Sequence, residues 1–373
     1  MRTVASILAL ALLAGCPPRK DANAPRRQPP ARTADERPYV APRDRGVPSI
    51  DLSAGKRLIR RQEWPAALRW FDDAVRQHPQ DSRTHFYRGV CLYNLKKMPA
   101  ALAAYRKAVK LKPQFFELWN NYGTALLVSG KAKPAVRALQ NAVKIQPKAA
   151  DGWLNLGLAY EEAHDLPAAA RAMEKAVTLA PAQASHHLAL ADVLRKMGRY
   201  AAAAKSYREA SQRRPRDVYI LLGLALSLAR SNQGDEAVKT LARARALKPG
   251  SLRVQMAAGL VLGLVNKHAE AAKAYAKAIG LKPDVPVLHL MLGRTYLKLK
   301  RYRPAYKSLQ QAARLSAKRP RHRLRTLDFY LAEALRHLGR CRQAKPKYRA
   351  FIQRVPKGPL TDLAKAHLKR CRR

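Results

Sequence analysis

The chain has 373 residues and a formal net charge of +48, from 73 Lys and Arg against 25 Asp and Glu. The excess is uneven, because residues 286–373 carry 25 Lys and Arg but only three acids, Asp328, Glu333 and Asp362. Such a field attracts polyanions and acidic partners, but few aromatic residues are interleaved with the basic ones, so base-stacking recognition of nucleic acid is not expected.

The N-terminus has the pattern of an export signal. After a short charged start, Val4 to Leu13 is a nearly unbroken apolar run that is too short to span a bilayer. It ends in Leu13-Ala-Gly-Cys16, which resembles a bacterial lipobox, where the chain is cut before a cysteine that is then lipid-modified. The resemblance implies a signal peptide over residues 1–15 and stable lipid attachment at Cys16. The alternative is an ordinary export signal with a chance cysteine.

The next segment, residues 16–48, begins with the lipobox cysteine. It is rich in Pro, Arg, Ala and Asp, with almost no aliphatic periodicity. They cannot bury a core, so we expect an extended tether that holds the next domain away from the membrane. By resemblance to envelope lipoproteins, Pro17 in place of Asp after the cysteine favours the outer membrane, with the protein facing the periplasm.

From residue 49 the chain repeats itself every 34 residues. The clearest copy is Trp153 to Pro181, in which apolar spacings of three and four predict two short helices. Neither helix is long enough to be stable alone, so the unit must stack on its copies. The proline that ends a copy recurs as Pro79, Pro113, Pro147, Pro181, Pro215, Pro249 and Pro283. The small residue of the first helix recurs as Gly89, Gly123, Gly157, Ala191, Ala225, Gly259 and Gly293.

This pattern resembles the tetratricopeptide repeat, which places Trp, Leu-Gly, Tyr, Ala, an aromatic residue, Ala and Pro at fixed offsets in 34 residues. The resemblance covers about residues 49–356. It implies an all-α, right-handed α-solenoid of about nine helix-turn-helix repeats, each contacting only its neighbours. A basic insertion that ends at Arg325 breaks the period by five residues. Residues 357–373 include an amphipathic segment, which we expect to form a C-terminal capping helix.

The cysteines beyond Cys16 differ in what they predict. Cys91 lies between apolar neighbours in a first helix, so we expect it to be buried. Cys341 and Cys371 lie at similar distances before and after a turn expected near residues 356–359. Antiparallel helices would bring them side by side, and an oxidising compartment would then favour a disulfide that closes the cap. Two unpaired thiols are the alternative.

No constellation of residues predicts catalysis. The sequence has no glycine-rich phosphate loop, and His186 and His187 are neighbours on a helix, where adjacent side chains do not face each other. We therefore expect no enzymatic activity, no cofactor and no metal site.

The resemblance implies recognition instead, because the first helices of tetratricopeptide repeats line a concave groove that holds a peptide or a partner helix. In repeats two to four the candidate groove residues are Phe86, Tyr87, Val90, Asn120, Asn121 and Asn155. In repeats six to eight a candidate apolar groove comprises Leu222, Leu226, Met256, Leu260 and Leu290. The alternative is that these apolar residues are simply core.

Two functions are consistent with the sequence. The first is a non-enzymatic scaffold or adaptor lipoprotein of the bacterial cell envelope, of the outer-membrane, cell-wall or pilus assembly type. It would bind protein partners, acidic ones being favoured by the charge. The second is direct binding of lipopolysaccharide or anionic lipid by the basic C-terminal third. The candidate polyanion patch comprises Arg319, Arg321, Arg323 and Arg325. The charge could also be solvated outer surface with no partner.

Overall fold

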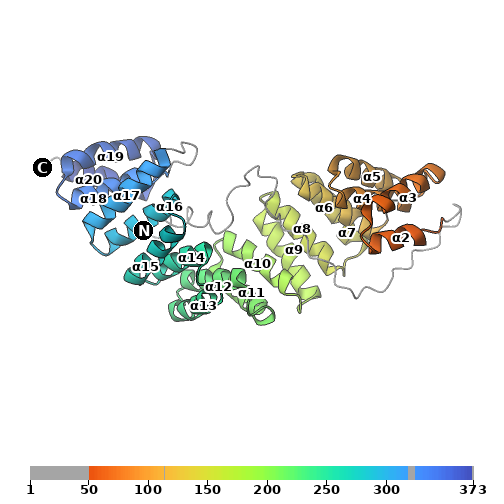
Figure 1. Ribbon diagram of the computed structural model, residues 1–373, viewed down its shortest axis with the longest axis horizontal. Coiled ribbons are helices and arrows are strands. Elements are labelled where there is room, and N and C mark those ends of the chain that lie inside the picture. The colour runs from red at the N-terminus through yellow and green to blue at the C-terminus, as the bar shows by residue number, and fades with distance from the viewer. Residues whose placement is uncertain (1–49, 113, 318–323, 372–373) are drawn as a thin grey trace. The chain divides into compact units, whose positions relative to one another are not determined.

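The computed structural model describes residues 50–112, 114–317 and 324–371. The expected signal peptide, Cys16 and the tether lie outside the described residues, as do Arg319, Arg321 and Arg323. In the described parts, every regular element is an α-helix, and the helices follow one another as antiparallel pairs (Figure 1). The paired helices belong to two compact units, which we call the N-terminal unit and the C-terminal unit.

The N-terminal unit consists of five helix pairs. Its helices are α2 (Ser53–Arg60), α3 (Trp64–Gln77), α4 (Ser82–Asn94), α5 (Met98–Leu111), α6 (Phe116–Val128), α7 (Ala132–Ile145), α8 (Ala150–Glu162), α9 (Leu166–Leu179), α10 (Ala184–Lys196) and α11 (Tyr200–Arg213). Each pair contacts the next pair along the chain, so the apolar core extends lengthwise through the unit.

The C-terminal unit consists of four further pairs and one last helix. Its helices are α12 (Val218–Arg230), α13 (Gly234–Leu247), α14 (Leu252–Leu264), α15 (His268–Leu281), α16 (Pro286–Lys298), α17 (Tyr302–Ala317), α18 (Leu327–His337), α19 (Cys341–Arg354) and α20 (Pro359–Arg370). The expected all-α solenoid of nine helix pairs is confirmed for the part of the chain that the structure describes.

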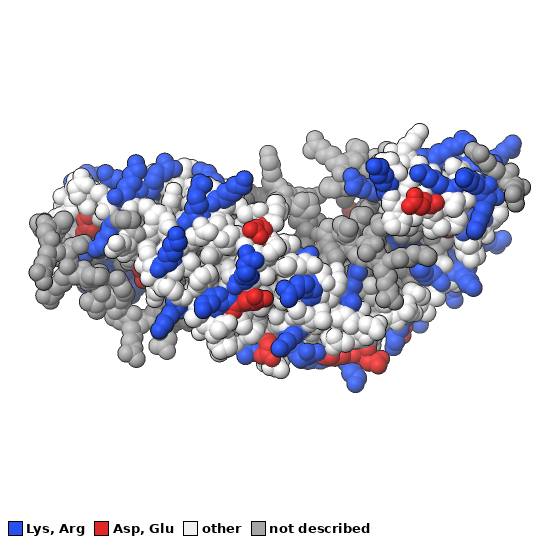
Figure 2. Space-filling view, turned by 180° about the vertical axis from the view of Figure 1, so that it is seen from behind, with Lys and Arg blue, Asp and Glu red and all other residues white. Residues whose placement is uncertain are grey.

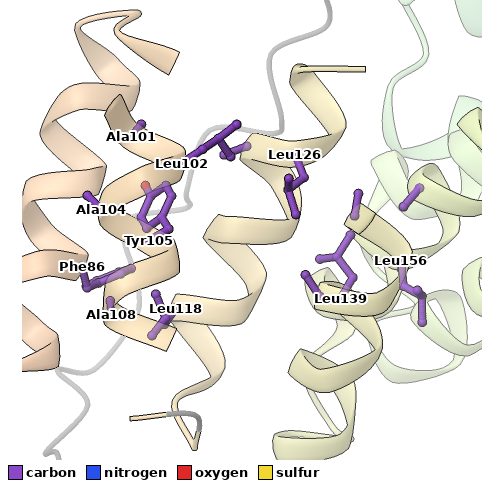
Figure 3. Close-up of a cluster of buried hydrophobic side chains, with 14 of the residues drawn as sticks. Phe86, Ala101, Leu102, Ala104, Tyr105, Ala108, Leu118, Leu126, Leu139 and Leu156 are labelled. Atoms are coloured by element: carbon purple, nitrogen blue, oxygen red, sulfur yellow. The ribbon is translucent and has the colours of Figure 1, made fainter. Parts of the chain in front are cut away.

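In six of the first helices the small residue is a glycine that lies against a large side chain of the second helix. A Cβ atom added to Gly123 would lie 2.5 Å from Cγ of Leu139, and one added to Gly157 would lie 2.6 Å from Cγ of Met173. Figure 3 shows the core that this close approach builds, in which Tyr105 and Leu139 are buried between the helices. Close helix packing therefore explains why the sequence keeps a small residue at this position.

A second recurring contact joins successive pairs. The fourth residue of many first helices donates a hydrogen bond to the carbonyl of the proline six residues earlier. Examples are Trp153 Nε1 to Pro147 at 2.8 Å and Gln255 Nε2 to Pro249 at 2.7 Å. The feature that indole, imidazole and amide groups have in common is an N–H donor. This position of the repeat therefore requires a hydrogen-bond donor more than an aromatic ring.

The turn inside each helix pair contains one residue with a left-handed backbone. These residues are Gln62, Lys96, Gly130, His164, Gly198, Asn232, Asn266, Lys300 and Gly339, with φ between 57° and 78°. Glycine adopts this conformation without the steric cost that other L-residues pay. Four of the turns use Gln, Lys or His, so each of those turns holds a strained residue.

Replacing Lys96 by glycine should therefore raise the free energy of unfolding by about 0.5–1 kcal/mol, because the relief of the left-handed backbone exceeds the entropy that glycine adds to the unfolded chain. Gly130 occupies the same place in the next pair, and a Cβ there would meet nothing within 4 Å. The matched control Gly130→Lys should lower the free energy by a similar amount. Urea unfolding of both variants measures the effect, and an unchanged Lys96→Gly midpoint would contradict it.

The C-terminal unit ends in a covalently closed cap. A disulfide joins Cys341, at the start of α19, to Cys371, just after α20, with Cα atoms 5.3 Å apart. Helix α20 covers Tyr348 and Phe351 of α19, which are fully buried. The disulfide is the pairing predicted from the sequence, and the last helix covers the apolar face that the ninth pair would otherwise expose.

Candidate functional site

A row of polar contacts joins the first helices of neighbouring pairs in the N-terminal unit. The three contacts each link residues 35 apart in the sequence: Asn155 with Asn120, His186 with Asp151, and Lys196 with Glu161. The row therefore runs along α6, α8 and α10. We call the surface of α6 and α8 that carries Asn120, Asn121 and Asn155 the polar face. In its centre Asn155 Nδ2 donates to Asn120 Oδ1 at 3.0 Å. Neighbouring repeats thus present their amide side chains side by side.

The polar face differs in charge from the rest of the unit. Helices α6 and α8 contain no Lys or Arg, and they carry the acids Glu117, Asp151, Glu161 and Glu162. The second helices around them are basic, with Arg106, Lys107, Lys110, Lys133, Arg137, Lys144, Arg171 and Lys175. A hydrogen bond from His186 and its nearby charge lower the pKa of Asp151, which keeps this carboxylate ionised. Around α6 and α8 the positive charge therefore lies on the second helices.

Five of the predicted groove residues in this unit reach the surface in part. Tyr87, Val90, Asn120, Asn121 and Asn155 are half-buried. Asn121 and Asn155 are 34 residues apart and so occupy the same position of the repeat, but Asn155 bonds to Asn120. The offset of 35 shows that facing positions on neighbouring first helices are displaced by one residue from the sequence repeat.

Phe86 does not belong to this surface, and its prediction as a groove residue is wrong. Its side chain is only 3% exposed and packs within the core cluster of α4–α9. The ring centroid lies 5.2 Å from that of Phe115 and 6.2 Å from that of Tyr105. A ligand has no access to a ring enclosed in this way.

The apolar groove predicted in repeats six to eight is also wrong for most of its residues. Leu222, Leu226 and Leu290 are buried, so they are core side chains, and Met256 and Leu260 are half-buried. The exposed large apolar side chains of the described residues are Ile145, Leu281 and Leu363, on three different helices. No contiguous apolar patch results among the described residues, and the alternative of core leucines holds.

One buried polar network lay beyond sequence reasoning. Asp192 and Arg195 lie on the first helix α10 and are each less than 5% exposed. The hydroxyl of Tyr207 on α11 donates to Asp192 and accepts a hydrogen bond from Arg195 Nε at 3.0 Å. Two features of the sequence could have indicated this network. The oppositely charged Asp192 and Arg195 are three residues apart on one helix, and Tyr207 occupies the aromatic position of the next helix.

The adjacent histidines serve different neighbours. His187 Nε2 lies 2.8 Å from the carbonyl of Pro181, in the recurring donor position, whereas His186 faces Asp151 of the preceding pair. Within the described ranges, no group of three or more His, Cys, Asp or Glu could hold a metal ion. Cys91 is buried as expected, and burial raises the pKa of its thiol to about 12.

A largely buried carboxylate joins the three last helices of the C-terminal unit. Glu333 on α18 accepts hydrogen bonds from the Tyr348 hydroxyl, from Arg336 at 3.1 Å and from His367 Nδ1 at 2.6 Å. Burial alone would raise the pKa of Glu333, but these three donors outweigh it and hold the pKa below its usual value. This arrangement is structural, because it holds α20 in place.

Family models and solved structures place these features in a known group. Models of the tetratricopeptide repeat match residues 52–114, 122–184, 188–251, 222–286, 265–326 and 327–358. A search of curated proteins finds no match.

Several solved structures are similar to this chain. The C-terminal part of a TPR repeat-containing protein from Cytophaga hutchinsonii superposes with a TM-score of 0.53 at 16% identity, covering 65% of this chain and 99% of that one. The hetero-tetramer Cut9-Hcn1 of APC/C gives 0.51 at 19% identity, covering 86% of this chain and 60% of that chain. The pilF protein of Pseudomonas aeruginosa gives 0.48 at 24% identity, covering 55% and 93%.

The repeat models together cover most of the chain from residue 52 to residue 358. The helix pairs, their small-residue contacts and their stacking agree with this match. The chain therefore belongs to the tetratricopeptide repeat family, whose members are in general non-enzymatic scaffolds for protein–protein interaction.

Proposed function

We propose that the chain is a lipid-anchored scaffold of the bacterial cell envelope that binds a protein partner on its polar face. The observation that carries the binding role is the row of half-buried amides at Asn120, Asn121 and Asn155, which lies on two helices without a basic residue. Amide side chains can donate to and accept from the backbone of an extended peptide. A surface of this kind recognises a chain without requiring one particular charge.

The anchor is proposed from the sequence Leu13-Ala-Gly-Cys16, with the outer membrane and the periplasm as its location. No helix in the described part of the chain is long and apolar enough to cross a membrane. We expect cells to incorporate a palmitate analogue into the full chain, and Cys16→Ser to abolish the label. Equal labelling of Cys16→Ser and the parent chain would contradict the anchor and leave the binding role standing.

A crosslinked pull-down from membranes tests the binding role. The double variant Asn121→Ala, Asn155→Ala should recover about ten-fold less partner protein, which corresponds to about 1.4 kcal/mol and is reasonable for two lost hydrogen bonds. The matched control is Asn141→Ala, which removes the same group from the second helix α7. Equal recovery by the double variant and the parent chain would overturn the proposed face.

A second candidate function is binding of an envelope polyanion by the C-terminal third. Two of the three acids in residues 286–373 are engaged inside their own unit, Asp328 by Arg354 and Glu333 by its three donors. Most of the positive charge there is therefore not neutralised, and Arg325, the described member of the predicted patch, is exposed. Recovery of lipopolysaccharide or anionic lipid alone in the pull-down would favour this function over the first.

A further inference from the structure

A pocket of about 460 Å³ opens in the C-terminal unit, between α17 and the pair α18–α19. Its walls come from α17 and α19, and Leu331 and Leu335 of α18 contribute its apolar base. Ala313 is a further small apolar residue of the lining. The pocket is large enough for one bulky side chain with part of its backbone.

Three exposed cations stand around this pocket. Lys307 and Arg314 come from α17, seven residues apart and so on one side of that helix, and Lys347 comes from α19 on the opposite wall. No acid is among the described residues that line the pocket. The aliphatic stems of these side chains also extend the apolar wall, while their charged ends reach water.

The second helices of the C-terminal unit supply no counter-charge here. Helices α17 and α19 contain no Asp or Glu, whereas in the N-terminal unit α3 pairs Arg76 with Asp73 and α11 pairs Arg213 with Glu209. Lys and Arg greatly outnumber the acids on the face of the molecule that Figure 2 shows. The cations of the pocket therefore suit carboxylates or phosphates from another molecule.

The uncharged lining residues favour a peptide over a lipid or a free anion. Gln310 and Gln311 place two amide groups beside the pocket, and Gln310 Nε2 donates to the hydroxyl of Tyr306 at 2.8 Å, which leaves its carbonyl oxygen as an acceptor. A peptide backbone offers donors and acceptors to such amides, and an acyl chain offers neither. The apolar base would contribute nothing to the binding of inorganic phosphate.

We propose that this pocket binds an acidic segment of a partner protein, with one apolar side chain in the pocket and carboxylates facing Lys307, Arg314 and Lys347. The inference rests on the protein-binding role proposed above but concerns a different surface. In this proposal the positive charge of the C-terminal unit attracts the acidic segment, and the apolar pocket fixes the position of that segment along the surface. A uniformly solvated basic surface would have no such preference for an apolar residue.

The test is fluorescence anisotropy with the full chain and a labelled peptide in which one leucine is flanked by glutamates. The triple variant Lys307→Gln, Arg314→Gln, Lys347→Gln should weaken binding by about 30-fold or more. The matched control is Lys133→Gln, Arg137→Gln, Lys144→Gln on α7, which removes the same side chains from the other unit and should cost less than about three-fold. Thermal unfolding of both variants confirms that they remain folded.

Two further measurements separate the pocket from the general field. Ala313→Trp fills the pocket without changing its charge and should lower the affinity for the leucine peptide by about ten-fold. A peptide with glycine in place of leucine should bind the parent chain about ten-fold more weakly than the leucine peptide does. Equal losses for the two triple variants would overturn the proposal in favour of a diffuse field. Binding of anionic vesicles but not of the peptide would overturn it in favour of a lipid. Partner recovery through the polar face would survive either failure.

Discussion

Removing the Cys341–Cys371 disulfide is expected to lower the free energy of unfolding of the C-terminal cap by about 3–4 kcal/mol. The bridge joins residues 30 apart in sequence. Closing a loop of that size lowers the conformational entropy of the unfolded chain, which corresponds to about this free energy. Helix α20 depends on it strongly, because this helix has twelve residues and covers one face of a single pair. A helix so short is marginal without tertiary support.

Hydrogen exchange measures this effect where it acts. In the double variant Cys341→Ser, Cys371→Ser the amides of α20 should exchange about 100-fold faster or more, while those of α4–α9 keep their protection, since repeats contact only their neighbours. A reductant should reproduce the loss in the parent chain. The control Cys91→Ala lacks the buried free thiol. In this variant, reductant should accelerate the hydrogen exchange of α20 as much as it does in the parent chain. Unchanged α20 exchange after reduction would contradict the prediction.

The cap shows why some features could be predicted from the sequence. The 34-residue period fixes where each helix pair begins, and the turn after Val355 then makes α19 and α20 antiparallel. Once that is known, two cysteines at similar distances from the turn must lie close together. The left-handed turn residues carry the same information: their spacing changes only between Lys300 and Gly339, where the basic insertion lies. Local pattern and chain connectivity suffice for these features.

The groove residues could not be predicted from the repeat pattern alone. A leucine in the fifth place of a first helix, such as Leu222 or Leu290, has the same sequence pattern whether it faces a groove or the next pair. That choice depends on how far each pair is rotated against its neighbour, which is a property of packing between pairs. The same rotation makes Asn155 face Asn120 and not Asn121.

The carboxylate of Glu333 should be the most sensitive single polar group of the C-terminal unit. Glu333→Ala is expected to lower its free energy of unfolding by about 3–4 kcal/mol, because Tyr348, Arg336 and His367 would each keep a donor without its acceptor in a largely buried site. Glu333→Gln keeps one acceptor oxygen and should cost about half as much. The control Glu270→Ala removes an exposed acid that is 3.8 Å from Lys267 and should cost less than about 0.5 kcal/mol.

The pH dependence of stability distinguishes the charge of Glu333 from its shape. Its pKa in the folded state lies below the ordinary value of 4.5, so its contribution is present above pH 4.5 and is lost as the pH falls through the lower folded-state pKa. Urea unfolding of the parent chain should therefore show a loss of C-terminal stability below pH 4.5. Glu333→Gln cannot titrate, and its acid limb should be flatter. If both chains lose stability in parallel, other carboxylates cause the acid sensitivity, and Glu333 acts by shape alone.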